Sequence, residues 1–504
     1  MSLDMLVLVM PMVEPAAPTA GAGVIKAHLE ASGYAAEVYD INIDLYNELK
    51  SRGEHEYHYF NGEGAMKFSN NLGSPLNDEM EQFYQDNKEI FHKWVRMIED
   101  KNPTWLGFSL LSPFSAAAAI KITSLVKQYL PHIKTVWGGT NIQHEGITHY
   151  VREGILDFFI KGDGERAILE LLKGNTSFPG INKIHSIDEI TPLDDSLAPD
   201  YSDIKWNEYD ELWAPKTCFV SASRGCVRQC TFCNDHQIWP TYRFKSPEKV
   251  AEQIEELVTK YDRETIHFTD SLLNGSPPIY EKLLIEMKRI KQAQNAKNKP
   301  FRWMSHLIFR PKNQMPERVY RLMSESGCED AVMGLESFSE SVRWHMKKKF
   351  TNEDVWYTFE MLNKYKIHMQ CLILIGYATE TEEDHQENLR GIDKVYELGY
   401  GNAKDDNGNP LWRWTFGNSL LLNEQHDLYD ILKGEDPHAF EHHTAMDWKF
   451  RDNDMATRLR RWKESIARVQ MHDPHYKPSP TTQRTIEITE ERLNNPDGPR
   501  FWSE

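Results

Sequence analysis

Three cysteines, Cys226, Cys230 and Cys233, lie together on one short segment of the chain with the spacing C-x3-C-x2-C. No fourth cysteine is close to them in the sequence. Iron–sulfur clusters of the four-iron type are normally held by four thiolates. Three thiolates on one loop would hold such a cluster by three corners and leave one iron open. Because an open coordination position is where a catalytic metal site binds its substrate, the spacing predicts a reactive iron–sulfur site.

A zinc site is the alternative interpretation of this segment. Structural zinc takes four ligands, usually in pairs, and Asp235 or His236 could supply the fourth. The other cysteines, Cys218, Cys328 and Cys371, are dispersed along the chain. Because a buried free cysteine behaves as a small hydrophobic residue, we expect these three in the core.

Length, charge and cysteine content narrow the class of protein. A chain of 504 residues is expected to contain two or three domains. The formal charge of -18 argues against partners such as nucleic acid or anionic membranes, which attract basic surfaces. Six cysteines, three of them clustered, do not form a disulfide framework, and the chain carries no apolar run long enough to span a bilayer. We therefore expect a soluble, cytoplasmic protein.

The N-terminal part alternates apolar strands with helical stretches, which predicts an α/β fold with a doubly wound parallel sheet over residues 1–180. The expected strands are Leu3–Met10, Ala36–Asp40, Trp105–Leu110, Thr135–Trp137 and Asp157–Ile160, with helices at Gly23–Ser32, Ala116–Tyr129 and Glu165–Leu172. A polar, aromatic-rich insertion at about 45–101 is expected to be helical. Residues 181–215, with scattered Pro and Asp, are expected to form a linker.

A second alternation of strands and helices predicts a partial (β/α)6 barrel over residues 216–428. Its expected strands are Cys218–Ala222, Thr265–Thr269, Arg302–His306, Asp330–Leu335, Met369–Ile375 and Trp412–Phe416. The cysteine segment directly follows the first of them. This placement fits a barrel, in which the chemistry lies at the carboxyl ends of the strands.

The remainder, residues 429–504, is expected to be a mostly helical extension. Apolar residues spaced as on one helical face predict a docking helix there: Met455, Leu459, Trp462, Ile466 and Val469. Basic residues lie mostly off that stripe and are expected to form a solvated face: Arg458, Arg460, Arg461, Lys463 and Arg468.

The cysteine spacing, with the aromatic Phe232 just before the last cysteine, resembles the signature of the radical S-adenosylmethionine (SAM) superfamily. The resemblance implies a [4Fe-4S] cluster whose open iron chelates SAM, and cleavage of SAM by one electron to a 5′-deoxyadenosyl radical. It also implies cofactor contacts at the strand ends, which we assign to Phe232, Asp270, Ser271, Arg310, Glu336, Ser337 and Ile375. The segment after Ile375 departs from the family pattern, because Ala378 stands where a proline is usual.

The N-terminal sheet resembles the Rossmann-like, cobalamin-binding domain of class B radical SAM proteins. The resemblance rests on segments at the predicted strand ends and implies cobalamin contacts at Ser109, Leu111, Gly138 and Gly139. Small residues suit such a site, because a backbone approaches a planar ligand only where the Cβ is absent or short. The DxHxxG motif that carries a cobalt-binding histidine is absent, since residues 40–44 read Asp-Ile-Asn-Ile-Asp. A purely structural domain therefore remains the alternative.

The resemblance implies a cobalamin-dependent radical SAM enzyme that methylates an unactivated carbon of a small molecule or a peptide. It also implies an electron donor such as flavodoxin or ferredoxin. One alternative is a radical cyclisation, rearrangement or oxidation, with or without cobalamin. The other is a non-catalytic binding protein stabilised by a metal.

Overall fold

The computed structural model describes residues 3–11, 13–53, 76, 78–111, 114–140, 142, 146–183, 191–210, 215–417, 420, 422, 426–436 and 448–495. Much of the predicted insertion, residues 54–75, therefore lies outside the described residues. The chain divides into two compact units. The first comprises Met1–Val220 and Glu252–His267, and the second comprises Ser221–Ala251 and Phe268–Glu504. The domain boundaries expected from the sequence stay predictions.

The first unit contains a five-stranded sheet with the order β2-β1-β3-β4-β5, and all its strand pairs are parallel. Its strands are β1 (Met5–Val9), β2 (Ala36–Asp40), β3 (Trp105–Ser109), β4 (Lys134–Gly138) and β5 (Phe158–Phe159). This is the flavodoxin-like strand order, in which ligands bind at the carboxyl ends of the strands beside the β1/β3 switch point. The predicted doubly wound sheet is confirmed.

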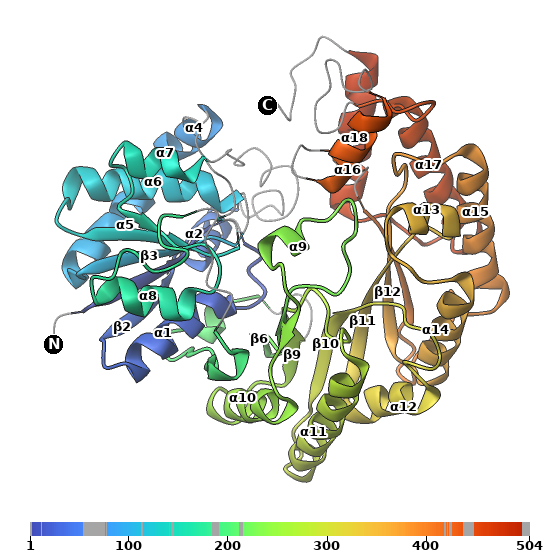
Figure 1. The fold of residues 1–504 in the computed structure, drawn as a ribbon, viewed down its shortest axis with the longest axis horizontal. Coiled ribbons are helices and arrows are strands. Elements are labelled where there is room, and N and C mark those ends of the chain that lie inside the picture. The colour runs from blue at the N-terminus through green and yellow to red at the C-terminus, as the bar shows by residue number, and fades with distance from the viewer. Residues whose placement is uncertain are drawn as a thin grey trace. The chain divides into compact units, whose positions relative to one another are not determined.

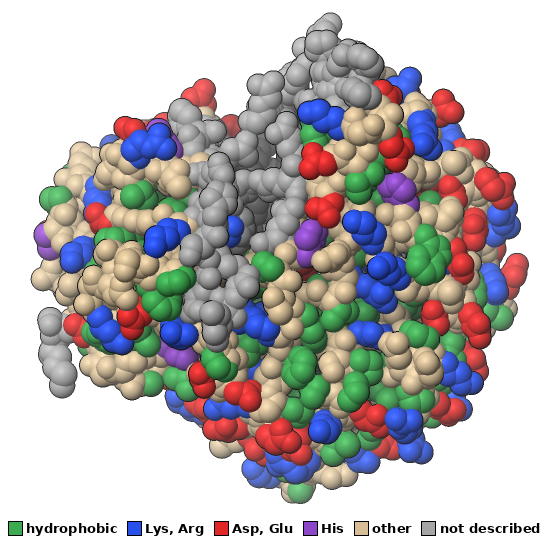
Figure 2. All heavy atoms as spheres, in the orientation of Figure 1, with side chains coloured by type: hydrophobic (Ala, Val, Ile, Leu, Met, Phe, Trp, Pro, Cys, Tyr) green, Lys and Arg blue, Asp and Glu red, His purple; other side chains and the backbone are tan. Residues whose placement is uncertain are grey.

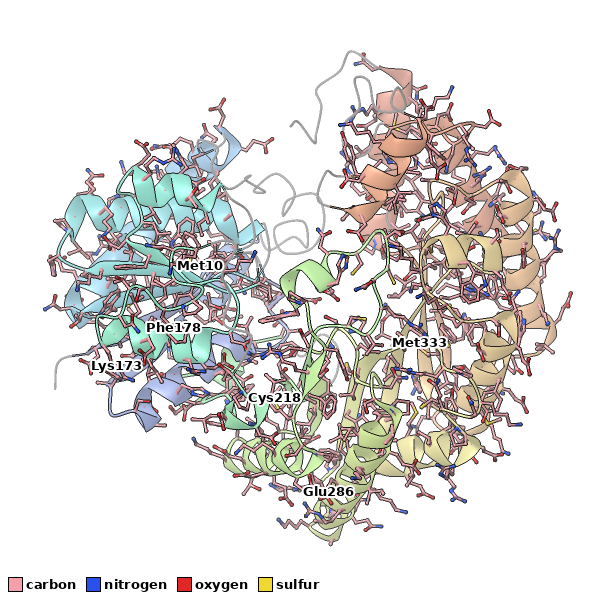
Figure 3. The ribbon with its side chains drawn as sticks, in the orientation of Figure 1. Met10, Lys173, Phe178, Cys218, Glu286 and Met333 are labelled. Atoms are coloured by element: carbon pink, nitrogen blue, oxygen red, sulfur yellow. The ribbon has the colours of Figure 1, made fainter. Side chains whose placement is uncertain are left out.

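Helices cover both faces of this sheet (Figure 1). Alternate residues of β1 face opposite ways and therefore enter two separate cores. Leu6 and Leu8 join one core, formed with α2 (Ile41–Ser51), α4 (Asp78–Asp86), α5 (Lys88–Lys101), α6 (Phe114–Tyr129) and α7 (Ile147–Arg152). Met5 and Val7 join the other core, formed with α1 (Ala20–Ala31) and α8 (Gly164–Leu172). Met10, at the carboxyl end of β1 (Figure 3), is fully buried.

Part of the predicted linker packs against α1. Residues 191–210 contain two short helical turns, η2 (Leu193–Asp195) and η3 (Trp206–Glu208). Lys26 of α1 is buried, and its Nζ donates to Asp203 at 2.7 Å and to Ser202. The buried ammonium is thus paired by the segment that follows the sheet. Within the described residues this segment is held by the first unit.

The second sheet is the partial barrel, with the strand order β13-β12-β11-β10-β9-β6. Its strands are β6 (Thr217–Val220), β9 (Thr265–Phe268), β10 (Arg302–Leu307), β11 (Cys328–Glu336), β12 (His368–Ile373) and β13 (Trp412–Phe416), and β10 to β13 pair in parallel. The division between the two units cuts this sheet at β6 and within β9. The strand positions expected from the sequence are correct to within two residues.

Helices lie on the outside of the barrel strands (Figure 1). They are α10 (Pro247–Lys260), α11 (Pro277–Ala296), α12 (Glu317–Ser326), α14 (Asn352–Lys364) and α15 (Glu382–Glu397). Charged side chains of both signs mix over this outer surface in Figure 2, as in the pair of Lys288 and Glu325 at 2.7 Å. Glu286 of α11 lies on the same surface, whereas Met333 of β11 is buried (Figure 3). Because exposed ion pairs stabilise little, apolar packing between helices and sheet holds this layer.

The C-terminal extension forms α16 (Asp427–Glu435), α17 (Met455–His472) and α18 (Pro480–Asn494). The predicted apolar stripe of α17 is buried at Leu459, Trp462, Ile466 and Val469. Among the described residues, no helix is long and apolar enough to cross a membrane.

The expectation that the basic residues of α17 form a solvated face is wrong for Arg458 and Arg461, which are only 1% and 3% exposed. Arg461 donates to the backbone oxygen of Glu380 at 2.8 Å and pairs with its carboxylate at 3.3 Å. Arg458 donates to Trp448 O and lies over the Trp448 ring. The guanidinium groups are buried because the loop after β12 offers a buried carboxylate and the segment before α17 offers backbone oxygens.

The buried Glu380 predicts a pH-dependent stability. Burial raises its pKa to about 7, although Arg461 acts in the opposite direction. The folded protein therefore keeps a proton that the unfolded chain loses near pH 4.5. This contribution to stability is present below that pH and is lost as the pH rises through 7. We expect the stability of the wild type relative to Glu380→Gln to fall by roughly 1–3 kcal/mol between about pH 5 and pH 8.

Thermal unfolding of both proteins at the two pH values tests this expectation. Glu383→Gln, which removes an exposed carboxylate three residues further along the chain, is the control and should behave like the wild type. A difference between wild type and Glu380→Gln that does not change with pH would contradict it.

Candidate functional site

A short hairpin that sequence reasoning missed carries the cysteine segment. β7 (Ser223–Arg224) pairs antiparallel with β8 (Arg243–Phe244), and the loop between them contains the cysteines and the single-turn helix α9 (Asp235–Ile238). Gly225 begins the loop with a φ of +83°. A Cβ there would lie 2.8 Å from Thr241 O on the returning side of the loop. Glycine therefore allows the two sides to close together.

Asp270, at the carboxyl end of β9, anchors this hairpin. Its carboxylate accepts hydrogen bonds from the Ala222 backbone N at 3.0 Å and from the Ser223 hydroxyl. Asp270 is buried, and burial raises its pKa to about 6. Both carboxylate oxygens of this predicted cofactor-binding residue therefore accept hydrogen bonds that anchor the hairpin. The neighbouring Ser271 is exposed.

The three cysteines are all half-buried. The Arg228 backbone N donates to Cys226 Sγ at 3.4 Å, and the Cys233 N donates to Cys230 O at 3.1 Å, which closes a turn between the two later cysteines. Burial raises the pKa of Cys226 and Cys230, and it raises that of Cys233 to about 12. Because metals bind the thiolate form, a bound cation must supply the charge that stabilises three thiolates here.

The geometry does not favour a single zinc ion. Among the described residues, one group of candidate ligands has its atoms within 4.8 Å of one another, formed by Glu382, His385 and Glu464. The cysteines with Asp235 or His236 form no such compact group. Ligands of one tetrahedral ion must converge on it, at bonds of about 2.0–2.3 Å. Thiols on separate corners of a cluster need not converge on one point.

A charged pair lies beside the cysteines at the end of β11. Lys348 Nζ contacts Glu336 Oε1 at 2.8 Å and Gly334 O at 2.7 Å. Lys348 also lowers the pKa of Cys230, against the larger effect of burial. Glu336 has a φ of +65°, and a Cβ on Gly334 would lie 2.5 Å from Glu336 Oε1. The strained turn and the glycine together let the Glu336 carboxylate fold back onto Lys348.

Two arginines add positive charge near the thiols. Arg228 lies between Cys226 and Cys230, and its Nε is buried with no hydrogen-bond partner among the described residues. Arg310, a predicted site residue, donates from Nε to Asn274 O at 3.2 Å. Burial lowers the pKa of both arginines, and the charge of Arg228 lowers that of Arg310 further. Sequence reasoning missed Arg228, although a basic residue between two of the clustered cysteines was a usable signal.

The remaining predicted residues of this site differ in their surroundings. Phe232 packs edge-to-face on Tyr377 with 6.4 Å between ring centroids. Ile375, two residues after β12, is buried. Ser337 is also buried, and its hydroxyl donates to Asn388 of α15 at 2.9 Å. Glu336 and Arg310 therefore lie near the cysteine loop, which itself carries Phe232, whereas Ser337 is engaged by a helix.

In the first unit, the four predicted residues lie at the carboxyl ends of the neighbouring strands β3 and β4. Leu110 N donates to Gly138 O at 2.8 Å, which ties the two strand ends together. Gly139 has a φ of +118°, and a Cβ on it would lie 2.3 Å from Leu110 O. Gly138 faces open space, Leu111 is 48% exposed, and Ser109 is half-buried. The strand ends thus present an accessible surface of small and apolar groups at the expected ligand edge.

Parts of this chain are similar in sequence to known proteins. Residues 220–391 match the family model described as "Radical SAM superfamily". A protein of Pyrococcus horikoshii named "Uncharacterized methyltransferase PH0819" is 24% identical over 334 residues, which cover 62% of this chain and 70% of that protein. The anaerobic magnesium-protoporphyrin IX monomethyl ester cyclase of Cereibacter sphaeroides is 20% identical over 317 residues, 59% of this chain and 50% of the cyclase. The chain thus spans about half the length of that relative.

Two solved structures share the fold along nearly the whole chain. The radical SAM methyltransferase TsrM from Kitasatospora setae aligns over 97% of this chain and 96% of its own, with a TM-score of 0.66 at 16% identity. The cobalamin-dependent SAM radical enzyme OxsB aligns over 97% of this chain and 71% of its own, with a TM-score of 0.67 at 13% identity. Residues 220–391 are therefore similar to the radical SAM superfamily. The Rossmann-like sheet followed by the partial barrel is a fold that this chain shares with TsrM and OxsB.

The close contact at Gly225 yields a prediction about cluster assembly. Gly225→Ala adds a Cβ that meets Thr241 O, so we expect the loop to open and the reconstituted protein to lose most of its iron. Gly399→Ala is the matched control, since Gly399 also has a positive φ, of +78°, but nothing lies within 4 Å of its Cβ position. Iron and sulfide analysis after anaerobic reconstitution is the measurement. Equal iron content in the two variants would show that the contact is unimportant.

Proposed function

We propose that this protein is a radical SAM enzyme that methylates an unactivated carbon with the help of cobalamin. The observation that carries the proposal is the trio of half-buried thiols on one hairpin loop, without a compact fourth ligand among the described residues. Cys226, Cys230 and Cys233 would hold a [4Fe-4S] cluster. When bound, the cluster and SAM supply one-electron chemistry that activates a C–H bond, and cobalamin supplies the methyl group.

The residues around the loop have distinct roles in this proposal. Arg228 and Arg310 provide positive charge where three thiolates and the carboxylate of SAM would gather. Glu336, held by Lys348, presents a fixed acceptor for the polar groups of SAM. Phe232, packed on Tyr377, offers a flat apolar surface for an adenine ring. These groups bind and orient the cofactor, and none of them is needed to move a proton.

The first unit is proposed to hold the cobalamin at the ends of β3 and β4. A planar cofactor fits there because Gly138 faces open space and Leu111 is exposed. The segment after β2, where a cobalt-binding histidine could stand, is used for local structure instead. Asn42 accepts a hydrogen bond from Val13 N at 2.9 Å, and Asp40 accepts one from Ile43 N at the start of α2. We therefore propose that cobalamin is held without a protein ligand from this segment.

The substrate is proposed to be a small molecule or a peptide, and the electron donor a protein of the flavodoxin or ferredoxin class. A cytoplasmic location fits the six free cysteines, because thiols stay reduced in that compartment.

Replacing one proposed ligand tests the cluster assignment. Cys230→Ala should leave the fold intact and reduce formation of 5′-deoxyadenosine to background, because two thiolates cannot hold the cluster with one iron open. Cys328→Ala, which removes a buried free thiol at the start of β11, is the control and should retain activity. Anaerobic assays with a chemical reductant and chromatography of the nucleoside provide the measurement. SAM cleavage by Cys230→Ala at the wild-type rate would contradict the ligand assignment.

One alternative reaction to methyl transfer is supported by a specific observation. The similarity to the magnesium-protoporphyrin cyclases favours, as a second candidate, a radical oxidation or cyclisation without methylation. SAM labelled in its methyl group separates the two candidates. The proposal predicts label in the product, whereas 5′-deoxyadenosine formed with an unlabelled product would favour the cyclisation.

The close contact between Gly139 and Leu110 yields a test of cobalamin binding. Gly139→Ala places a Cβ against Leu110 O, and we expect it to weaken cobalamin binding by roughly tenfold, about 1.4 kcal/mol. Gly154→Ala is the control, because Gly154 has a φ of +69° and open space around its Cβ position. Cobalt content and an absorbance titration with hydroxocobalamin report binding, and iron content should be the same in both variants. Unchanged cobalamin affinity in Gly139→Ala would place the cofactor elsewhere or exclude it.

A further inference from the structure

The cysteine loop is fixed most firmly at Thr231, the residue that follows Cys230. Thr231 is fully buried, and all three of its polar groups are bound. Its backbone N donates to Met346 O at 3.3 Å, and its backbone O accepts from Leu428 N at 2.8 Å. Its hydroxyl shares a hydrogen bond of 2.7 Å with the hydroxyl of Tyr377. The position of Cys230, and through the following turn that of Cys233, therefore depends on contacts from outside the loop.

Among these contacts, one comes from a side chain in the segment after β12, that of Tyr377. It is fully buried in the segment after β12, and its hydroxyl also contacts His345 Nδ1 at 2.8 Å. Its ring packs on Phe232, the residue that follows Thr231. A buried hydroxyl with two partners has one preferred position, because losing either bond leaves an unsatisfied buried group. Tyr377 thus fixes the loop through both its ring and its hydroxyl.

The segment that carries Tyr377 is in turn held by the C-terminal extension. Asn453 is buried, and its Nδ2 donates to Tyr377 O at 2.7 Å and lies 3.3–3.4 Å from the oxygens of Gly376 and Ala378. The stem of Arg458 packs so closely on Gly376 that a Cβ there would lie 2.5 Å from it. Arg461 forms a buried pair with Glu380. Residues 448–472 therefore contact the segment after β12 at both of its ends, Gly376 and Glu380.

We infer that residues 448–472 form a brace that positions the iron–sulfur ligands, with Tyr377 as the positioning residue that links the brace to the loop. The path runs from Asn453 to the Tyr377 backbone, and from the Tyr377 hydroxyl to Thr231. This inference rests on the proposed cluster and gives the C-terminal extension a role in the same site. Every contact in the path lies within the second unit.

The test removes one hydroxyl group. Tyr377→Phe keeps the ring against Phe232 but breaks the contacts with Thr231 and His345. Tyr320→Phe is a matched control, because Tyr320 is also buried in the barrel and its hydroxyl also contacts a threonine, Thr358, at 3.1 Å. Two measurements on the full chain are compared: hydrogen–deuterium exchange of the peptide that contains the cysteines, and the electron paramagnetic resonance spectrum of the reduced cluster before and after SAM is added.

We expect faster exchange of the cysteine peptide in Tyr377→Phe, together with a cluster spectrum that differs from the wild type and responds less to SAM. Tyr320→Phe should match the wild type in both measurements. If Tyr377→Phe lacks either change, or if Tyr320→Phe shows the same changes, the positioning role is wrong.

A second variant tests the brace from the far end of the path. Asn453→Ala removes the donor to the segment after β12 without touching the cysteine loop, and it should reproduce both effects of Tyr377→Phe. Asn87→Ala is the control, because Asn87 is buried in the first unit and its Nδ2 likewise donates to a backbone oxygen, that of Phe83 at 2.9 Å. An Asn453→Ala protein whose exchange and spectrum match the wild type would remove the C-terminal extension from the inference.

Failure of the inference and failure of the proposed function can be told apart. A wild-type protein that assembles no cluster, or whose cluster ignores SAM, contradicts the proposed function. The exchange measurement does not depend on the cluster and still decides whether Tyr377 fixes the loop.

Discussion

The proposed site depends on one constraint, which is that three thiols must be held at fixed positions on a loop, with no compact group of further ligands beside them in the described part of the chain. The proposed cluster could not fix such a loop alone, because it would keep one iron accessible. The protein instead fixes the loop at its start and in its middle. Asp270 holds the strand before the loop by two hydrogen bonds, and Thr231 holds the middle by three. Gly225 allows the two sides of the loop to meet.

The basic side chains around the loop are explained by the same need to hold three thiols together. Burial raises the pKa of all three thiols, so the apoprotein favours the neutral form and the metal must supply the compensating charge. Lys348 and Arg228 bring positive charge to the same place, but Lys348 is partly compensated by Glu336. The Arg228 Nε, buried with no partner in the described part of the chain, marks the position where a further acceptor would be most favourable. The site is thus arranged to receive negative groups.

Much of the fold was predictable from the sequence, because buried parallel strands are apolar runs that alternate with amphipathic helices. The cysteine segment stands out in the sequence because its three thiols lie within eight residues of one another. The two-residue strands β7 and β8 were not, since so short a pairing leaves no periodic signal. Sequence alone also could not tell whether a polar residue at a strand end faces a ligand or the protein. Asp270 and Ser337 make hydrogen bonds within the protein, and Arg458 and Arg461 are buried because partners distant in sequence surround them.

The central claim is that Cys226, Cys230 and Cys233 hold a four-iron cluster whose remaining iron binds SAM directly. Electron–nuclear double resonance of the reduced wild-type cluster tests this claim most directly, with SAM labelled isotopically at its amino nitrogen and carboxylate oxygens. The account predicts hyperfine couplings from both labelled groups, as expected for atoms bonded to an iron of the cluster. A cluster that shows no coupling to either label would contradict it, as would a fourth iron coordinated by a protein side chain.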